Sequence, residues 1–434
     1  MNRAVITGIG IVSPFGLGWQ RWVAGLRAGT SATRAVTLFD PQCPIALPHG
    51  YGIMDTSRMR AGQPLSCRVA AEVPDFEPRD WIDKRDAGRV PRAVPLALAA
   101  TQEALHNAGL SLMNDGDRRS VDVVIGSGGG GFSFAEEQFA LWYGEGPQQI
   151  SPYAVSSSIA GMVSSEISIA HGFRGRSHTL SNGCTSSTDA LGAALDLIRC
   201  ERAQVVLSGG TDGCITPATL AGFCLMRAVP TKYNDCPARA SRPFDRDRDG
   251  FVLGEGAWIF VVEEWEHARA RGAKIWAEIA GHGATCEAYH RVALGEPDEA
   301  ARAMQLALTD ATVASDAIDY VNLHGTATAL NDPIETAAVK LALGPRAYDV
   351  PMSSTKSQIG HPQGASGAAG VAAALAAMHH GFVPPTINLD QPDERCDLDY
   401  VANTARPAEV QTALCNCLGF GSKNSALVLR RVSD

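Results

Sequence analysis

Charged residues are scarce in this sequence, since Asp, Glu, Lys and Arg make up 19% of it, against about 25% in an average globular protein. No long basic run is present, and the formal net charge is −9 with a pI near 5.7. This balance excludes a protein whose main partner is nucleic acid. A local arginine patch on such an acidic chain can still bind an acidic partner.

The sequence also lacks the long hydrophobic run that a membrane span requires. Its longest stretch of small apolar residues, 364–378, has 15 residues and is mostly Ala and Gly, whereas a span needs about 20 apolar residues. The first residues are too rich in Gly for a signal peptide. The 11 cysteines are irregularly spaced and contain no CxxC pair, which predicts reduced thiols, no metal site and a cytoplasmic protein.

No Pro- or Ser-rich linker divides the 434 residues. Short apolar runs alternate with helical patterns, which predicts an α/β fold whose sheets are covered on both faces. We expect two similar halves packed as one unit. The expected strands are 4–9, 121–125, 205–207, 257–263, 276–282, 318–323, 351–353, 414–417 and 426–430. The expected helices are 95–107, 156–171, 184–199, 267–271, 299–311, 334–343 and 364–379, with loops over most of 13–89.

Cys184 occupies the most reactive setting in the sequence. It follows the turn Ser181-Asn182-Gly183 and begins the helix TSSTDALGAALDLIR. A thiol at the positive end of a helix is favoured as thiolate, and the free backbone N–H groups there can bind an oxyanion. A buried, inert cysteine is the other interpretation of this position.

Two histidines lie in similar places. His324 ends an apolar strand and precedes Gly325, and His361 follows a strand and a glycine and precedes a helix of Gly and Ala. Lys356 lies five residues before His361. Each histidine alone also fits a structural role, but a cysteine, two imidazoles and an ammonium at strand-to-helix junctions together indicate acyl transfer.

The glycine run Gly126 to Gly131 suggests phosphate binding at first sight. It has no Lys-Ser or Lys-Thr after it, so it is not a P-loop. Glu145, near the spacing of a dinucleotide fingerprint, lies on no predicted strand. Both nucleotide interpretations are therefore disfavoured.

Seven motifs, in order along essentially the whole chain, carry a resemblance to a known family. They are VITGIGIVSPFG, GCTSSTDALG around Cys184, SRPFDRDRDGFVLGEGA, HGTATALNDPIET around His324, STKSQIGHPQGASGAAG around His361, PPTINLDQPDERCDLDYV and LGFGSKNSA. This set resembles the β-ketoacyl-acyl-carrier-protein synthases of the KAS II type, within the thiolase superfamily. The stretch GGFSFAEEQFALWYGEGPQQISPY and the Cys184 motif are more similar to ketosynthase subunits of type II polyketide systems.

The resemblance implies a thiolase fold with two pseudo-equivalent halves in five layers, α-β-α-β-α. The implied halves are 1–264, with Cys184, and 265–434, with His324 and His361. It also implies a dimer, of identical subunits or with a chain-length-factor-like subunit that lacks the cysteine. Cys184 takes an acyl group from the phosphopantetheine of an acyl carrier protein, and malonyl carrier protein then loses carbon dioxide and attacks the acyl thioester. No bound cofactor is implied.

The resemblance also implies roles for the other site residues. Nε2–H groups of His324 and His361 stabilise the enolate, and neither ring has to be cationic. Lys356 and Glu335 orient this network. Phe420 gates the site, and its backbone N–H forms the oxyanion hole with that of Cys184. The pantetheine-binding residues are Thr326 and Thr328, and Arg227 matches a carrier-protein docking position.

Departures from the family pattern raise further expectations. GFGSKN replaces the usual GFGGTN, so Ser422 and Lys423 change the loop beside Phe420. Lys423 faces either the carrier entrance or solvent. Gly129 stands where KAS II enzymes carry a bulky residue, which predicts a longer acyl pocket; a purely backbone role for this glycine is the alternative.

Three other functions stay open. They are a housekeeping KAS II of fatty-acid elongation, a thiolase-like acyltransferase that condenses without decarboxylation, and an inactive scaffold subunit. The thiolase-like enzymes use a Cys-His-Cys set, which His324 and His361 do not match. The scaffold would lack the nucleophile, which Cys184 supplies.

Overall fold

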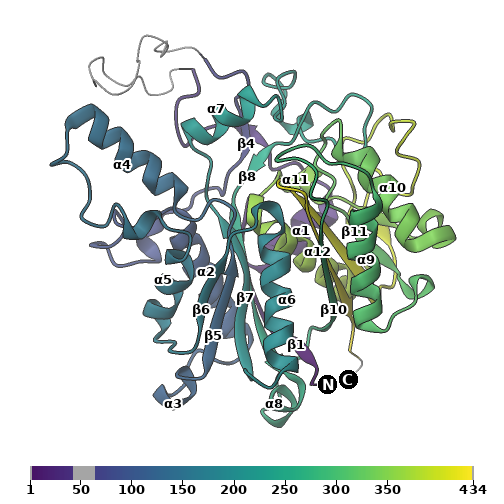
Figure 1. Cartoon of the computed structure of the whole chain (residues 1–434), viewed down its shortest axis with the longest axis horizontal. Coiled ribbons are helices and arrows are strands. Elements are labelled where there is room, and N and C mark those ends of the chain that lie inside the picture. Colours follow the sequence, from purple (N-terminus) through teal and green to yellow (C-terminus); the bar gives the residue numbers. More distant parts are fainter. Residues whose placement is uncertain (1, 43–63, 433–434) are drawn as a thin grey trace.

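The computed structural model describes residues 2–42 and 64–432 (Figure 1). Its main sheet contains two five-strand groups. The first runs β1-β9-β7-β5-β6 and the second β10-β16-β15-β11-β12. The strands are β1 (Ala4–Ser13), β5 (Val121–Gly126), β6 (Ser177–Leu180), β7 (Val205–Asp212), β9 (Gly256–Glu264), β10 (Ala277–Cys286), β11 (Tyr320–Asn322), β12 (Met352–Ser353), β15 (Thr412–Gly419) and β16 (Lys423–Arg430).

The two groups repeat the same pattern of pairing. In each, the first two pairs of strands are antiparallel and the last two are parallel. A short antiparallel pairing of β1 with β10, between Ala4–Ile6 and Ala277–Ile279, joins them. This internal repeat confirms the prediction of two similar halves. The division between residues 264 and 265, where β9 ends, stays a prediction.

Helices form three layers around the two groups of strands. The helix α2 (Ala93–Asn107) packs on the outer face of the first group, with Ala257, Ile259 and Val261 of β9. The alternate residues of β9 face inward, onto α6 (Ser186–Arg199) and α12 (Ser366–His380). Outside the second group lie α9 (Asp298–Ala311) and α10 (Asn331–Leu343). The order α-β-α-β-α confirms the predicted five-layer α/β fold (Figure 1).

The small residues of α12 let it lie close to α6 in the central layer. A Cβ at Gly367 would lie 2.0 Å from Oγ1 of Thr188 on α6. The backbone N–H of Ala368 also donates to Ser187 Oγ at 2.9 Å. The loop with Cys184 leads into α6, and the loop with His361 leads into α12. The close contact between the two helices therefore brings the starts of these helices together.

Some expected elements differ from the observed ones. The predicted helix 156–171 is wrong, since a 3₁₀ turn (Ser156–Ser158) is separated from α5 (Met162–His171) by Ile159 in an extended conformation. The predicted loop region contains α1 (Trp19–Ala28), bounded by glycines and burying residues at helical spacing. The helices α4 (Phe132–Glu145) and α7 (Pro217–Leu225) were also not predicted. The other predicted strands and helices are present, several of the strands being longer.

The described residues also form shorter strands and helices. They are β2 (Gly16–Leu17), β3 (Arg34–Ala35), β4 (Val69–Ala71), α3 (Asp115–Arg118), β8 (Leu253–Gly254), α8 (Trp265–Ala270), α11 (Lys356–Ile359), β13 (Phe382–Val383) and β14 (Arg406–Pro407). Among the helices of residues 2–42 and 64–432, none has the length and apolar content to cross a membrane.

Candidate active site

Cys184 lies in a single 3₁₀ turn, Gly183–Thr185, between β6 and α6. Gly183 allows the turn because its φ is +68°. The hydroxyl of Ser186 closes the turn by accepting from the N–H of Asn182 at 2.8 Å and donating to the carbonyl of Gly183 at 2.6 Å. The nucleophile candidate is therefore held in the helix entrance that the sequence predicted, and it is buried.

The electrostatic setting of the thiol differs from the expectation. Burial raises the pKa of Cys184 to about 11, although the Lys356 charge and backbone hydrogen bonds from Phe420 and Cys184 lower it. Desolvation thus outweighs the Lys356 charge and the two N–H groups, and it opposes the thiolate that the helix start is expected to favour. The backbone N–H groups of Phe420 and Cys184 are the predicted oxyanion-hole donors, and both lie within hydrogen-bonding reach of the Cys184 sulfur.

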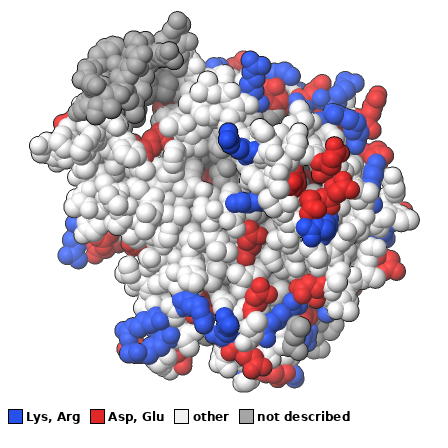
Figure 2. Space-filling model, viewed as in Figure 1, with Lys and Arg blue, Asp and Glu red and all other residues white. Residues whose placement is uncertain are grey.

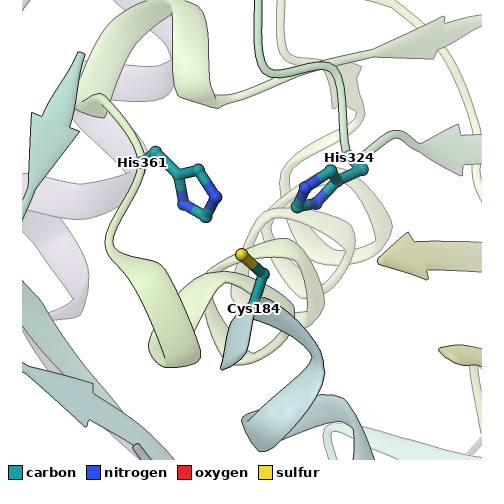
Figure 3. A group of neighbouring side chains, drawn as sticks. All are labelled: Cys184, His324 and His361. Carbon is teal, nitrogen blue, oxygen red and sulfur yellow. The ribbon is translucent and has the colours of Figure 1, made fainter. Parts of the chain in front are cut away.

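His324 and His361 lie on either side of the Cys184 sulfur (Figure 3). Their ring centroids are 5.3 Å apart and the rings are nearly perpendicular, at 87°. The Cys184 Sγ and one ring nitrogen of each histidine all lie within 4.8 Å of one another. The structure therefore brings together the three residues that sequence analysis selected from separate segments.

Both imidazoles are neutral in this setting. Burial, with the nearby Lys356 charge, holds the pKa of His324 and of His361 well below the usual value. The backbone N–H of Gln363 donates to His361 Nδ1 at 3.1 Å, and Ser366 Oγ lies 2.9 Å from the same nitrogen. Because Nδ1 of His361 is an acceptor, its single proton belongs on Nε2, which faces the site.

Lys356 and Glu335 are both buried beside this group. The Glu335 carboxylate accepts the backbone N–H groups of His324 at 2.6 Å and Gly325 at 2.7 Å. The side-chain amide of Asn416 donates to it at 2.7 Å. Burial raises the pKa of Glu335, these donors oppose the rise, and burial lowers the pKa of Lys356. Glu335 therefore holds the backbone of His324, not its ring.

Thr326 and Thr328 lie on the loop that follows His324. Their hydroxyl oxygens are 3.0 Å apart. The buried side chain of Arg248 donates to the carbonyl of Thr328 at 2.8 Å, and the N–H of Asn331 donates to the Thr328 hydroxyl at 3.3 Å. The loop is thus fixed from both sides, with the two hydroxyls together.

An aromatic series leads from Phe420 to His361. The rings of Phe420 and Phe223 have centroids 6.5 Å apart, those of Phe223 and Phe251 5.0 Å, and those of Phe251 and His361 5.2 Å. Beside it is a cavity of about 300 Å³, lined by Gly128, Gly129, Phe132, Cys214, Ala218, Thr219, Gly222, Phe223, Met226 and Gln363. Cys184, His324 and His361 do not line this cavity, but it adjoins the aromatic series through Phe223 and includes Gln363, two residues after His361.

Gly129 lines this cavity, but the space for a side chain there is already taken. A Cβ at position 129 would lie 1.9 Å from Sγ of Cys214. The φ of Gly129 is outside the left-handed region, whereas Gly130 has φ +48°. Sterics with Cys214, and not backbone strain, therefore require glycine at position 129.

Sequence analysis missed Asp212, which explains the glycine run. This buried carboxylate accepts from Ser127 Oγ at 2.9 Å and from the N–H groups of Gly128 at 2.8 Å, Gly129 at 2.9 Å and Gly364 at 2.6 Å. The glycine amides are thus satisfied within the protein, in agreement with the rejection of a phosphate loop. The position of Asp212 at the carboxyl end of β7 was the signal that could have identified it.

Two predicted residues lie away from the reactive group. Arg227 follows α7, is exposed and has φ +55°. Within the described ranges its guanidinium has no ion-pair partner. Ser422 is buried with φ +64°, and its hydroxyl accepts the N–H groups of Tyr289 and His290 at 3.2 and 3.1 Å. The changed loop beside Phe420 is therefore hydrogen-bonded to the segment that follows β10. Lys423 is half-exposed at the start of β16.

Comparison with known proteins agrees with this geometry. Residues 1–268 match the model of the β-ketoacyl synthase N-terminal domain, and residues 276–390 match that of the C-terminal domain. The chain is 40% identical to 3-oxoacyl-[acyl-carrier-protein] synthase 2 of Rhizobium meliloti, over 99% of both chains. It is 41% identical to the tetracenomycin polyketide synthase ketoacyl synthase alpha subunit of Streptomyces glaucescens, over 100% of this chain and 98% of that one.

Two solved structures cover the whole of this chain and are wholly covered by it. One is a type II PKS acyl-carrier protein in complex with its ketosynthase bound to the hexaketide, with a TM-score of 0.86 and 29% identity. The other is the ishigamide ketosynthase/chain length factor, with a TM-score of 0.86 and 33% identity. The fold, the Cys-His-His group and both domain matches lead to one conclusion. The chain belongs to the β-ketoacyl synthase family and is a β-ketoacyl-ACP synthase, an acyltransferase of fatty-acid or type II polyketide biosynthesis.

Proposed function

We propose that Cys184 carries the growing acyl chain and that condensation takes place between it and the two histidines. The sulfur attacks the thioester carbonyl of acyl carrier protein, and the pantetheine sulfur leaves with the thiol proton. The N–H groups of Cys184 and Phe420 stabilise the oxyanion of this step. The observation that carries the proposal is the Cys184 sulfur between two neutral imidazoles.

The second half-reaction uses malonyl carrier protein. Its carboxylate leaves as carbon dioxide, and the electron pair of the broken C–C bond forms an enolate. The Nε2–H groups of His324 and His361 donate to the enolate oxygen. The enolate carbon then bonds to the acyl carbonyl carbon, the bond to the Cys184 sulfur breaks, and the thiolate recovers a proton from water. No step needs a metal or a bound cofactor.

The surrounding residues position these groups. Lys356 places a positive charge beside Cys184, where it favours the thiolate that each condensation releases. Glu335 holds the His324 backbone. Thr326 and Thr328 bind the amides of the pantetheine arm through their adjacent hydroxyls. The apolar cavity at Gly129 takes the acyl chain.

The substrates arrive on an acyl carrier protein in the cytoplasm. Since the chain itself has a net charge of −9, docking of an acidic carrier requires a local basic group. Arg227 is exposed on the loop after α7, whose Phe223 lines the cavity. The carrier complex of the related polyketide ketosynthase supports this type of partner.

A dimer covers the apolar face beside β6. This strand ends the sheet order of the described residues. The helix α5 packs beside it, and α4 contacts the turn that precedes α5. Exposed apolar side chains of α4, α5 and the segment between them are Phe139, Trp142, Tyr153, Val155, Ile159 and Ile169. Charged side chains are sparse over this part of the surface (Figure 2). Exposed apolar patches and unpaired edges of this kind mark subunit interfaces.

The second subunit is a cysteine-lacking relative of the chain-length-factor type, which places the enzyme in type II polyketide synthesis. The ketosynthase/chain length factor structure and the polyketide alpha-subunit relative support this assignment. A homodimer would instead favour fatty-acid elongation. Native mass spectrometry of the enzyme purified from the cells that produce it distinguishes the two: a mixed dimer is expected, and a dimer of identical chains contradicts the polyketide assignment.

Intact-mass analysis after incubation with acyl carrier protein tests the nucleophile. One acyl adduct is expected on the wild-type chain and none on Cys184→Ala. Cys200→Ala, at an exposed cysteine, is the matched control and should load normally. Stoichiometric loading of Cys184→Ala would contradict the assignment.

A further inference from the structure

Ser422 ends the three-residue turn between β15 and β16, and Phe420 begins it. Gly419 and Lys423 pair with each other on either side of this turn. Phe420 directs its backbone N–H to the Cys184 sulfur. Two residues later, Ser422 is buried, with 4% of its surface exposed. One of the two oxyanion donors therefore belongs to a short turn whose other end is fixed in the interior.

The backbone of Ser422 has a conformation that serine rarely adopts. Its φ is +64°, in the left-handed region, where a residue with a Cβ is disfavoured relative to glycine. The family pattern GFGGTN has glycine at this position, and this chain has serine. A serine kept in a disfavoured conformation requires contacts that offset the cost, and these contacts indicate its role.

The Ser422 hydroxyl makes its contacts with the segment that follows β10. It accepts the backbone N–H groups of Tyr289 at 3.2 Å and His290 at 3.1 Å, and it donates to the carbonyl of His290 at 3.0 Å. A hydroxyl has one proton and two lone pairs, so these three bonds use its whole capacity. The side chain thus joins the turn to a separate segment of the chain.

Backbone hydrogen bonds join the same two segments. The N–H of Glu287 donates to the Ser422 carbonyl at 2.8 Å, and the N–H of Gly421 donates to the Arg291 carbonyl at 2.9 Å. Residues 288–291 are exposed, so hydrogen bonds rather than buried side chains hold this part of the segment against the turn. Of these five bonds, three pass through the hydroxyl that a glycine would lack.

We propose that Ser422 is a positioning residue whose hydroxyl anchors the turn, so that the Phe420 N–H stays directed at the oxyanion formed when Cys184 attacks a thioester. This inference rests on the proposed function, in which that N–H is an oxyanion donor. Malonyl decarboxylation does not use it, because the enolate oxygen is held by His324 and His361. The two half-reactions therefore respond differently to the loss of the anchor.

Two substitutions at position 422 separate the hydroxyl from the backbone. Ser422→Ala removes the hydroxyl and keeps the disfavoured φ, whereas Ser422→Gly removes the hydroxyl and relieves the backbone. Ser13→Ala is the matched control. The Ser13 hydroxyl is also buried, donates to the carbonyl of Gly16 at 3.2 Å and accepts the N–H of Phe15 at 3.3 Å, at the end of β1.

Acyl loading of Cys184 and carbon dioxide release from malonyl carrier protein are measured side by side. We expect both position-422 variants to load about tenfold more slowly, part of the hundredfold or more that removal of an oxyanion donor costs. Their carbon dioxide release should stay within about twofold of wild type, the range for uncoupled sites. Ser13→Ala should stay within about twofold in both half-reactions, even if it melts at a lower temperature.

The acyl donor gives a second readout, because the Phe420 N–H acts on the thioester oxygen whatever carries the acyl group. Loading from acyl carrier protein and from the acyl thioester of N-acetylcysteamine should therefore slow by the same factor. A loss confined to the carrier protein would overturn the proposal, since the turn would then be a docking surface.

The glycine variant decides between the hydroxyl and the backbone. If Ser422→Gly loaded as fast as the wild type, strain alone would explain the alanine variant, and the proposal would be wrong. An equal fall of both half-reactions in the two variants would also contradict it, because a disordered site gives that result. Failure of the proposed function looks different, since the wild type would then show no Cys184 adduct and no carbon dioxide release, and this inference would fail with it.

Discussion

Asp212 should be essential to the architecture of the site although it touches no substrate in the proposed reaction. Its carboxylate is the common acceptor for Ser127 and for the N–H groups of Gly128, Gly129 and Gly364. An alanine leaves three N–H groups without this acceptor, that of the buried Gly364 and those of the half-buried Gly128 and Gly129. At about 1–3 kcal/mol for each unsatisfied buried group, the loss of the Gly364 acceptor alone lowers the free energy of unfolding by at least about 1 kcal/mol.

Asparagine should be milder than alanine at position 212. With its amide nitrogen in place of Oδ1, its oxygen still accepts from Gly128 and Gly364, and the Ser127 hydroxyl can turn to accept. The N–H of Gly129 then faces the N–H₂ group of the asparagine, and this unsatisfied pair lowers the free energy of unfolding by about 1–3 kcal/mol. Because Gly364 is three residues after His361, both variants should also lower the rate of condensation.

Urea unfolding at one fixed protein concentration measures these differences, with Asp86→Asn as the control. Asp86 forms an exposed ion pair with Arg89 at 2.9 Å, so its variant should lose less than about 1 kcal/mol. A loss of under about 1 kcal/mol in Asp212→Ala, or an asparagine variant less stable than the alanine variant, would refute the reasoning.

The other predictions concern the catalytic and binding residues. His324→Ala and His361→Ala should each lose roughly a hundredfold in condensation, the scale of one oxyanion donor, while acyl loading survives better; equal loss of both half-reactions would contradict the division of roles. Arg227→Glu should raise KM for carrier-bound substrate, in a salt-sensitive way, and spare small thioesters; an equal effect on both would make the residue structural. Gly129→Ala should perturb the enzyme through the contact with Cys214, and Gly129→Ala with Cys214→Gly should restore folding and shorten the preferred acyl chain. If the double variant kept the wild-type chain preference, the cavity would not be the acyl pocket.

The fold and the reactive group were largely predictable from the sequence, because both depend on local patterns. Apolar runs followed by glycine marked the strand ends, and Cys184, His324 and His361 stand at three such junctions. The five-layer order followed from the family resemblance. The helix α1 escaped prediction because glycines border it and its tryptophans were taken as isolated aromatics.

What the sequence could not predict depends on distant groups meeting in the interior. Desolvation raises the Cys184 pKa against the helix end, and burial is not visible in a local motif. Asp212 joins segments 85 and 152 positions away. The alternation of Cys415 and Cys417 placed both on one side of a strand, but only the folded chain puts the second beside His324.

A condensation assay with mass detection of the carrier-bound product tests the central claim most directly. Wild-type enzyme, acyl carrier protein loaded with an acyl chain and malonyl carrier protein should give a 3-oxoacyl product two carbons longer, with one carbon dioxide released for each product. Cys184→Ala should give no product. Product formation by Cys184→Ala, or an elongated wild-type product without release of carbon dioxide, would contradict decarboxylative condensation at Cys184.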